Sequence, residues 1–455
     1  MSDDRLEQLL VQTDVEQLRM LVKHLYGRNE AIDTLITSHL LRQIPTELSQ
    51  HIQQRIQQLT RGKTFVDWRS VDIVSDAVDQ LVADIQQLAQ QNPVQALGLM
   101  DSLVASHNKL YERTDDSSGI LGFSYQQAAK AWLDLAACCR KHGLADRDWV
   151  AEIYQRHQHN NYAVWDRLLA DSAILLNTDE LTTLADKLIV ELQRTAEIHR
   201  QQPQAFDYLT VQTALLGVAE ALQDPNLYAA ALTIVSPEPN WMQRCSLIRF
   251  CLSIGAATEA LAWYQHSTSN ADHNLALLDQ IYTQLDDTAQ LREFRQRRYR
   301  EHPSFEHLQA LLPLVTETEA QKLQEQAAEI ALQVVDLAEA MEFLCQLQKY
   351  HLAAQRAITE HDGLRHMFYS QLADFAKLFR LNHQPLAAAL CYRALLDDIL
   401  DEGRSNAYSH AARYYQQLVE LDTKVRNYQP AIDHADYLDQ LRSRHARKRA
   451  FWAKV

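Results

Sequence analysis

The chain has 455 residues, of which 47% are hydrophobic and 23% charged, and its formal net charge is −15. This composition excludes a disordered chain, and the net charge excludes binding of nucleic acid or anionic membrane by the surface as a whole. Only 10 Gly and 10 Pro are present, too few for the turns of an all-β fold and unfavourable for alternating strands and helices. We therefore predict an all-α protein with at least 70% helix.

Apolar residues recur at helical spacing from the first residues onward. The spacing predicts helices over 6–25, over 29–41, from Pro45 onward, over 70–90 and from Pro93 onward. Together they predict an N-terminal helical bundle over residues 1–112. A turn-rich loop follows at 113–123, where we expect a domain boundary.

Helical spacing resumes after this loop, and a weaker boundary near Pro203 separates a middle helical region, 124–204, from residues 205–455. In the last region helices open on Pro or Gly followed by Ala, as at Gly255 and Pro385. A breaker, a small-residue helix and an aromatic-bearing partner helix, repeated every 33–45 residues or so, are typical of tetratricopeptide-like hairpins. We predict an irregular α-solenoid of TPR/HEAT-like helical hairpins, an α-α superhelix, with unrelated helical bundles as the alternative.

Three segments carry a resemblance to a known family. They are the opening Leu6-Glu-Gln-Leu-Leu with Val15-Glu-Gln-Leu, the central Asp115-Asp-Ser-Ser-Gly, and the ending from Tyr437 to Trp452. In this order they resemble a group of uncharacterised bacterial α-helical proteins, a domain of unknown function related to helical regions of SWIM zinc-finger proteins. The resemblance implies a helical-repeat fold and a bacterial cytosolic protein, and it implies no catalytic residue. The Cys-x-Cys…Cys-x-His zinc ligands of a SWIM finger are missing from this sequence.

The C-terminal segment from Arg442 to Val455 is basic in an otherwise acidic chain, with six cationic residues and no acid. Five of them are candidate partner or phosphate contacts: Arg442, Arg444, Arg447, Lys448 and Arg449. Either these side chains bind phosphates, or the segment is the closing helix of the solenoid, whose cations pair with acidic neighbours such as Asp397 and Asp401. We favour the closing helix.

A second basic segment lies at 292–300 and supplies three more candidate contacts: Arg292, Arg295 and Arg298. On a helix its arginines fan around the surface, which is weaker support for a phosphate groove than a single stripe. The alternative, which we favour, is a solvated helix end.

The loop residues Asp115, Asp116 and Ser117 have oxygen atoms for a hard cation or another ligand, but the spacing differs from an EF-hand loop. Asp and Ser also favour turns and helix caps, which is the interpretation we prefer. Six Cys occur without a CxxC pair, mostly in apolar helical context, so we expect reduced, mostly buried thiols.

No nucleophile elbow, P-loop, dinucleotide fingerprint or zinc-protease motif is present. We therefore predict a protein that is not an enzyme and needs no cofactor or metal. The favoured function is a scaffold or adaptor that binds a protein or peptide partner on a concave surface. The alternative is a nucleic-acid-associated accessory protein that uses the two basic segments. With no signal peptide and no apolar run near 20 residues, we expect a cytoplasmic location and no membrane contact.

Overall fold

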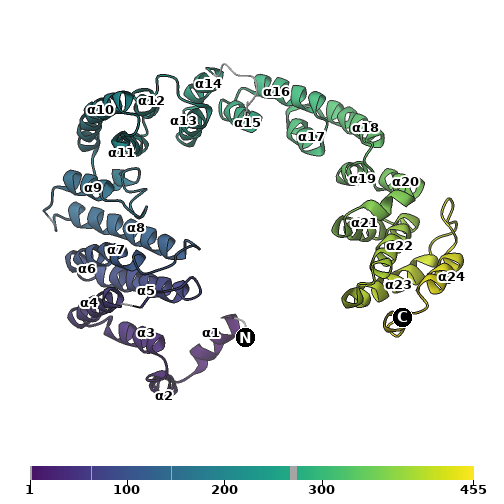
Figure 1. The fold of residues 1–455 in the computed structure, drawn as a ribbon, viewed down its shortest axis with the longest axis horizontal. Coiled ribbons are helices and arrows are strands. Elements are labelled where there is room, and N and C mark those ends of the chain that lie inside the picture. Colours follow the sequence, from purple (N-terminus) through teal and green to yellow (C-terminus); the bar gives the residue numbers. More distant parts are fainter. Residues whose placement is uncertain (1–2, 63, 145, 267–273) are drawn as a thin grey trace. The chain divides into compact units, whose positions relative to one another are not determined.

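The computed structural model describes residues 3–62, 64–144, 146–266 and 274–455. Helices account for 75% of the chain (Figure 1), which confirms the all-α prediction. Within the described residues, β-type pairing is limited to an isolated parallel bridge between Val66 and Thr114. None of the helices in those ranges combines the length and the apolarity needed to cross a membrane.

The chain divides into two compact units, residues 1–273 and 274–455. The first, unit 1, has the helices α1 Asp3–Gln12, α2 Val15–Leu25, α3 Glu30–Leu41, α4 Pro45–Arg61, α5 Val71–Ala89, α6 Pro93–Ala105, α7 His107–Tyr111, α8 Ile120–Lys141, α9 Trp149–Gln158, α10 Thr178–Gln201, α11 Asp207–Leu222, α12 Pro225–Thr233, α13 Trp241–Ser253 and α14 Ala257–Gln265, with a 3-10 turn η1 at Ser172–Ile174.

The second, unit 2, has the helices α15 Leu275–Gln284, α16 Thr288–Glu301, α17 Phe305–Leu311, α18 Glu317–Gln333, α19 Leu337–Gln346, α20 Tyr350–Thr359, α21 Tyr369–Leu381, α22 Pro385–Asp401, α23 Tyr408–Asp422, α24 His434–His445 and α25 Arg449–Trp452, with 3-10 turns η2 Leu312–Leu314, η3 His361–His366 and η4 Ser405–Ala407.

Local sequence signals set the ends of many helices. Asn177 caps α10 by accepting the backbone N–H of Glu180, whose carboxylate in turn accepts the N–H of Asn177. Proline fills the first position of α4, α6, α12 and α22, where it has no intrahelical N–H bond to lose. Helices α3 to α6 thus begin where the spacing predicts.

The first helical segment differs from its prediction, because it is two helices rather than one. Asp14 interrupts it with an extended backbone, and its carboxylate accepts the N–H groups of Glu16 and Gln17. An aspartate at this position stabilises a new helix start more than it stabilises helix continuation. The apolar spacing continues across the break, which is why periodicity alone misses it.

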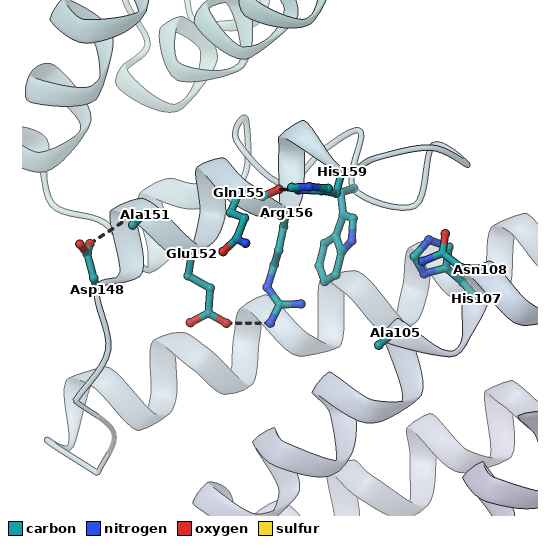
Figure 2. A pocket seen from close by; sticks show the side chains of 10 residues that line it. Ala105, His107, Asn108, Asp148, Ala151, Glu152, Gln155, Arg156 and His159 are labelled. Carbon is teal, nitrogen blue, oxygen red and sulfur yellow. Dashed lines mark hydrogen bonds and ion pairs between the residues drawn. The ribbon is translucent and has the colours of Figure 1, made fainter.

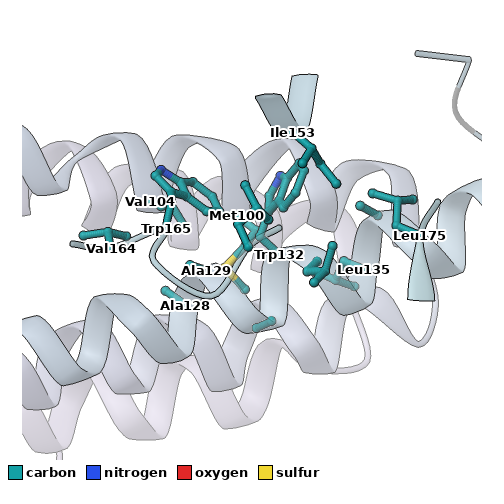
Figure 3. Close-up of a cluster of buried hydrophobic side chains, with 14 of the residues drawn as sticks. Met100, Val104, Ala128, Ala129, Trp132, Leu135, Ile153, Val164, Trp165 and Leu175 are labelled. Atoms are coloured by element: carbon teal, nitrogen blue, oxygen red, sulfur yellow. The ribbon is translucent and has the colours of Figure 1, made fainter. Parts of the chain in front are cut away.

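Helices that follow one another in the chain pack against one another within each unit, as α4 with α5, α10 with α11 and α21 with α22. The buried core of unit 1 extends from Leu48 in α4 to Ala231 in α12. Leu110 and Leu121, on either side of the 113–123 loop, both belong to it. At its centre the fully buried Trp132 meets Trp165 edge to face, with ring centroids 5.5 Å apart (Figure 3).

The buried core of unit 2 extends from Tyr299 to Phe451 and is organised around α22. This helix packs against both α21 and α23, and almost its whole length from Ala387 to Leu400 is buried. Two of its buried residues are charged, Arg393 and Asp397. Charged side chains are rarely buried unless they are paired, so this part of α22 is where we look for a site.

Candidate functional site

The central basic segment lies on α16, and each of its three candidate arginines already has a partner inside unit 2. The partners are Glu319 for Arg292, Asp279 for Arg295 and His307 for Arg298. The pairing of Arg295 is two-pronged, with nitrogen–oxygen distances of 2.8 and 2.7 Å, and its side chain is only 17% exposed. Carboxylates thus neutralise much of the charge that a phosphate groove would need.

The C-terminal basic segment forms α24 and the short α25, with a break at 446–448. Arg442 lies within 3.6 Å of Asp439 on the exposed surface, whereas Arg444 reaches the buried carboxylate of Asp397 at 3.2 Å. In the described part of the chain, no carboxylate lies within 4.0 Å of the three other candidate contacts of this segment, Arg447, Lys448 and Arg449. Of the five candidate contacts, one is therefore directed toward a buried carboxylate, and three have no carboxylate partner among the described residues.

Apolar side chains of α24 and α25 lie in the core of unit 2, and α25 packs on α23. Tyr437, Leu441 and Phe451 are buried, and Phe451 meets the rings of Tyr408 and Tyr415 at centroid distances of 6.0 and 6.5 Å. Phe451 is fully buried, while the neighbouring Trp452 is only partly buried. The break between α24 and α25 turns the phenylalanine inward.

The loop residues Asp115, Asp116 and Ser117 lie before α8 and use their oxygen atoms locally. Asp116 accepts the N–H groups of Leu121 and Gly122 at 3.0 and 2.8 Å, which caps the helix, and Asp115 accepts the N–H of Ser117 at 3.2 Å. In the described ranges, no group of three or more His, Cys, Asp or Glu side chains is arranged to hold a metal ion.

All six cysteines are free thiols, and all but the exposed Cys138 are buried, which confirms their predicted state. Burial raises the pKa of Cys345 to about 12 and that of Cys391 further above its ordinary value. A reactive thiol needs a lowered pKa, so these buried thiols act as packing residues.

A cavity of about 530 Å³ in unit 1 lies between α7 and α9 and has Arg156 on its wall (Figure 2). The guanidinium of Arg156 is 4.1 Å from the ring centroid of Trp132, and it pairs with Asp101 and Glu152, both at 2.7 Å. Arg147 pairs with the same two carboxylates. Two arginines and two carboxylates balance each other here, so the network needs no further ligand to hold it together.

A second cavity, of about 370 Å³, lies in unit 2 between η3, α22 and α24. The carboxylate of Asp397 is on its wall and is 3% exposed as a residue. Its oxygens accept the hydroxyl of Tyr437 at 3.0 Å, and they lie 3.2 Å from Arg444 and 3.4 Å from Arg365. Burial raises the pKa of Asp397, while the charge of Arg444 and the hydroxyl of Tyr437 act in the opposite direction.

Arg393 shares the wall of this cavity, one helical turn before Asp397. Its guanidinium lies between the rings of Tyr428 and Tyr437, at 4.7 and 4.5 Å from their centroids, and one nitrogen donates to the carbonyl of Ile432 at 2.7 Å. Nε and the other terminal nitrogen have no hydrogen-bond partner among the described residues, although Arg393 is only 5% exposed. Burial lowers the pKa of this arginine, which is the cost expected of a poorly paired buried cation.

Arg365 and Arg444 therefore contact one buried carboxylate, and Arg393 lies on the same cavity wall. Neither Arg365 nor Arg393 was among the residues that the sequence singled out. The sequence does hold a signal: Arg393 and Asp397 are four residues apart in an apolar helix and so share one face. A charged pair on the buried face of a helix indicates a polar site, but it does not identify the partners on other helices.

Residues 16–454 match the family of unknown function DUF6880. The match covers nearly the whole chain, and the protein belongs to this family. No curated protein matches the chain.

Proposed function

We propose that the protein is a non-enzymatic cytoplasmic scaffold or adaptor, an irregular TPR-like α-solenoid that binds a protein partner. The packing of many helices on their neighbours in the chain supports this, because repeat arrays are built from such nearest-neighbour contacts. The resemblance to helical regions of SWIM zinc-finger proteins is part of this proposal, and no zinc ligand is carried over from it.

The observation that favours a partner is the exposed apolar face of α2, formed by Val15, Leu18, Leu21, Val22 and Leu25. No residue of α2 is buried. Leu21 is 51% exposed and Val15 is 63% exposed, although their spacing is that of a helix that packs. An apolar helix face normally packs against another element, so we expect a partner to cover this face of α2.

The occupant that the geometry favours is an amphipathic helix of a protein partner. Many helices that are neighbours in the chain pack on one another, and a partner helix laid on the apolar face of α2 would extend this packing. An apolar surface usually recognises such a helix through apolar side chains at its positions i, i+3 and i+7.

Variants on the two faces of α2 test the proposal. The double variant Leu21→Glu/Leu25→Glu places charge on the apolar face, and Glu16→Lys/Arg19→Glu reverses two exposed charges on the other face as a matched control. We expect crosslinking in nuclease-treated native lysate to capture one defined helical partner with the wild type and the control but not with the apolar-face variant. Equal capture by all three proteins would contradict the proposal, as would a homodimer that only the apolar-face variant dissociates.

Nucleic-acid association stays a second candidate, favoured by the three unpaired cations Arg447, Lys448 and Arg449. Binding through phosphates must weaken steeply with salt. Replacement of these three residues by Gln should then reduce both the affinity for a labelled oligonucleotide and the salt slope. An unchanged affinity would remove this candidate.

A further inference from the structure

We propose that the cavity at Asp397 is a binding site for a small dianion of the phosphate class, held by Arg365, Arg393 and Arg444. This site is separate from the partner surface proposed on α2 and does not depend on it. Three elements that are distant in the chain form it: Arg365 comes from η3, Arg393 from α22 and Arg444 from α24.

The charge of the cavity wall favours a dianion. Arg365, Arg393 and Arg444 line the cavity together with the one buried carboxylate of Asp397, so these groups carry two more positive than negative charges. The charges of Asp422 and Asp401 also act on Arg393 and Asp397, respectively, but neither residue lines the cavity. His361 and Asp362 also line the cavity, but the Asp362 side chain is 96% exposed, so water and salt screen its charge. A monoanionic carboxylate ligand would balance only one of the two charges.

Arg393 supplies a fixed anchor with unused donors. Two tyrosine rings hold its guanidinium in place, and two of its nitrogens lack a hydrogen-bond partner among the described residues. A buried donor without a partner is costly, and the cost is removed when a small shift of the wall brings an oxyanion against it. Because the guanidinium is already positioned, little side-chain freedom is lost when a ligand binds.

Arg365 and Arg444 supply the mobile part of the site. Their side chains are 59% and 40% exposed, and they lie 3.4 and 3.2 Å from the Asp397 oxygens. Charge-assisted hydrogen bonds are usually shorter, at about 2.7–2.9 Å, so both arginines are held loosely. A bound phosphate can form two-pronged contacts with both arginines in place of Asp397. The ligand therefore competes with the Asp397 carboxylate for these two guanidinium groups.

The size of the cavity favours a small ligand. Its volume of about 370 Å³ lies near the lower end of the roughly 300–1,000 Å³ that is usual for ligand pockets. Three arginines converging in so small a volume match the oxygens of a single phosphate group better than an extended polymer.

Calorimetric titration of the full-length protein with inorganic phosphate, at constant ionic strength in chloride, tests the proposal. Arg365→Gln should weaken phosphate binding at least tenfold. Arg380→Gln should leave it unchanged, since this α21 arginine donates to Gln417 outside the cavity and changes the charge by the same amount. Asp397→Asn removes the competing charge while keeping a polar group for Tyr437, and it should tighten phosphate binding severalfold.

Acetate in place of phosphate distinguishes the two anion classes. We expect acetate to bind at least tenfold more weakly than phosphate. The proposal is overturned if the wild type shows no binding beyond the effect of ionic strength, if Arg365→Gln and Arg380→Gln bind phosphate equally, if Asp397→Asn weakens binding, or if acetate binds as tightly as phosphate.

Discussion

Phe451 should decide whether the C-terminal segment stabilises unit 2 or only carries charge. The side chain is fully buried against Tyr408 and Tyr415, with Trp452 alongside at a ring distance of 4.9 Å. Replacing a buried phenylalanine with alanine costs about 3–5 kcal/mol, through lost burial and the cavity that remains. For a unit of this size each kcal/mol lowers the melting temperature by about 2–4 °C. We therefore expect Phe451→Ala to lower it by about 6–20 °C.

Thermal unfolding followed by circular dichroism at 222 nm measures this shift, with urea unfolding as a second measure of the free energy. The matched control is Arg447→Gln/Arg449→Gln, two residues from the same segment that are exposed and have no carboxylate partner in the described structure. Surface changes of this kind usually stay within about 0.5 kcal/mol. If Phe451→Ala melts within a degree or two of the wild type, the assignment of this segment as part of the core is refuted.

Three further predictions follow from single side chains. Arg444→Gln should lower the free energy of unfolding by about 1–3 kcal/mol in urea titrations, because it leaves the buried Asp397 with one fewer partner. Burial lowers the pKa of His157 below its ordinary value of 6.5, so the unfolded chain takes up a proton at a pH where the folded one does not. The stability that neutral His157 contributes is thus complete above pH 6.5 and is lost as the pH falls below it. Urea unfolding at pH 7.5 and 5.5 should show this loss, and His157→Gln should reduce it. A thiol reagent added to the native protein should modify Cys138 promptly and leave the five buried thiols unmodified until the protein is denatured.

The sequence predicts elements that depend on neighbouring residues and misses those that depend on distant ones. Pro45 and Pro93 fix helix starts by themselves, since a proline tolerates the first turn of a helix and little else within it. The break at Asp14 is equally local, but the uninterrupted apolar spacing across it conceals the cap. Apolar periodicity and capping residues must therefore be considered separately, because the apolar spacing can continue across a residue that ends one helix and begins the next.

The basic segments show why a run of charge in sequence says little about charge on the surface. Arg292 and Arg295 are neutralised by carboxylates that lie 27 and 16 residues away, and no local pattern reveals those pairings. The C-terminal segment divides in the opposite way, since Arg444 turns inward and Arg447 does not. The helix break after His445 lies between these two arginines, so their side chains do not follow one continuous helical spacing.

The cavity at Asp397 was also missed because its residues are distant in the sequence, although the two residues on α22 could have been noticed. Arg393 and Asp397 lie four residues apart on α22 in a run that is otherwise almost entirely apolar. Burying two charges costs more than their mutual attraction returns unless other groups complete the arrangement. Here Tyr437, 40 residues from Asp397, supplies part of that completion, and two nitrogens of Arg393 still lack an acceptor. Leucine at position 393 would remove the burial cost of the charge, but also the two ring contacts and the hydrogen bond to Ile432. The two nitrogens without an acceptor are the part of Arg393 that the proposed phosphate would satisfy.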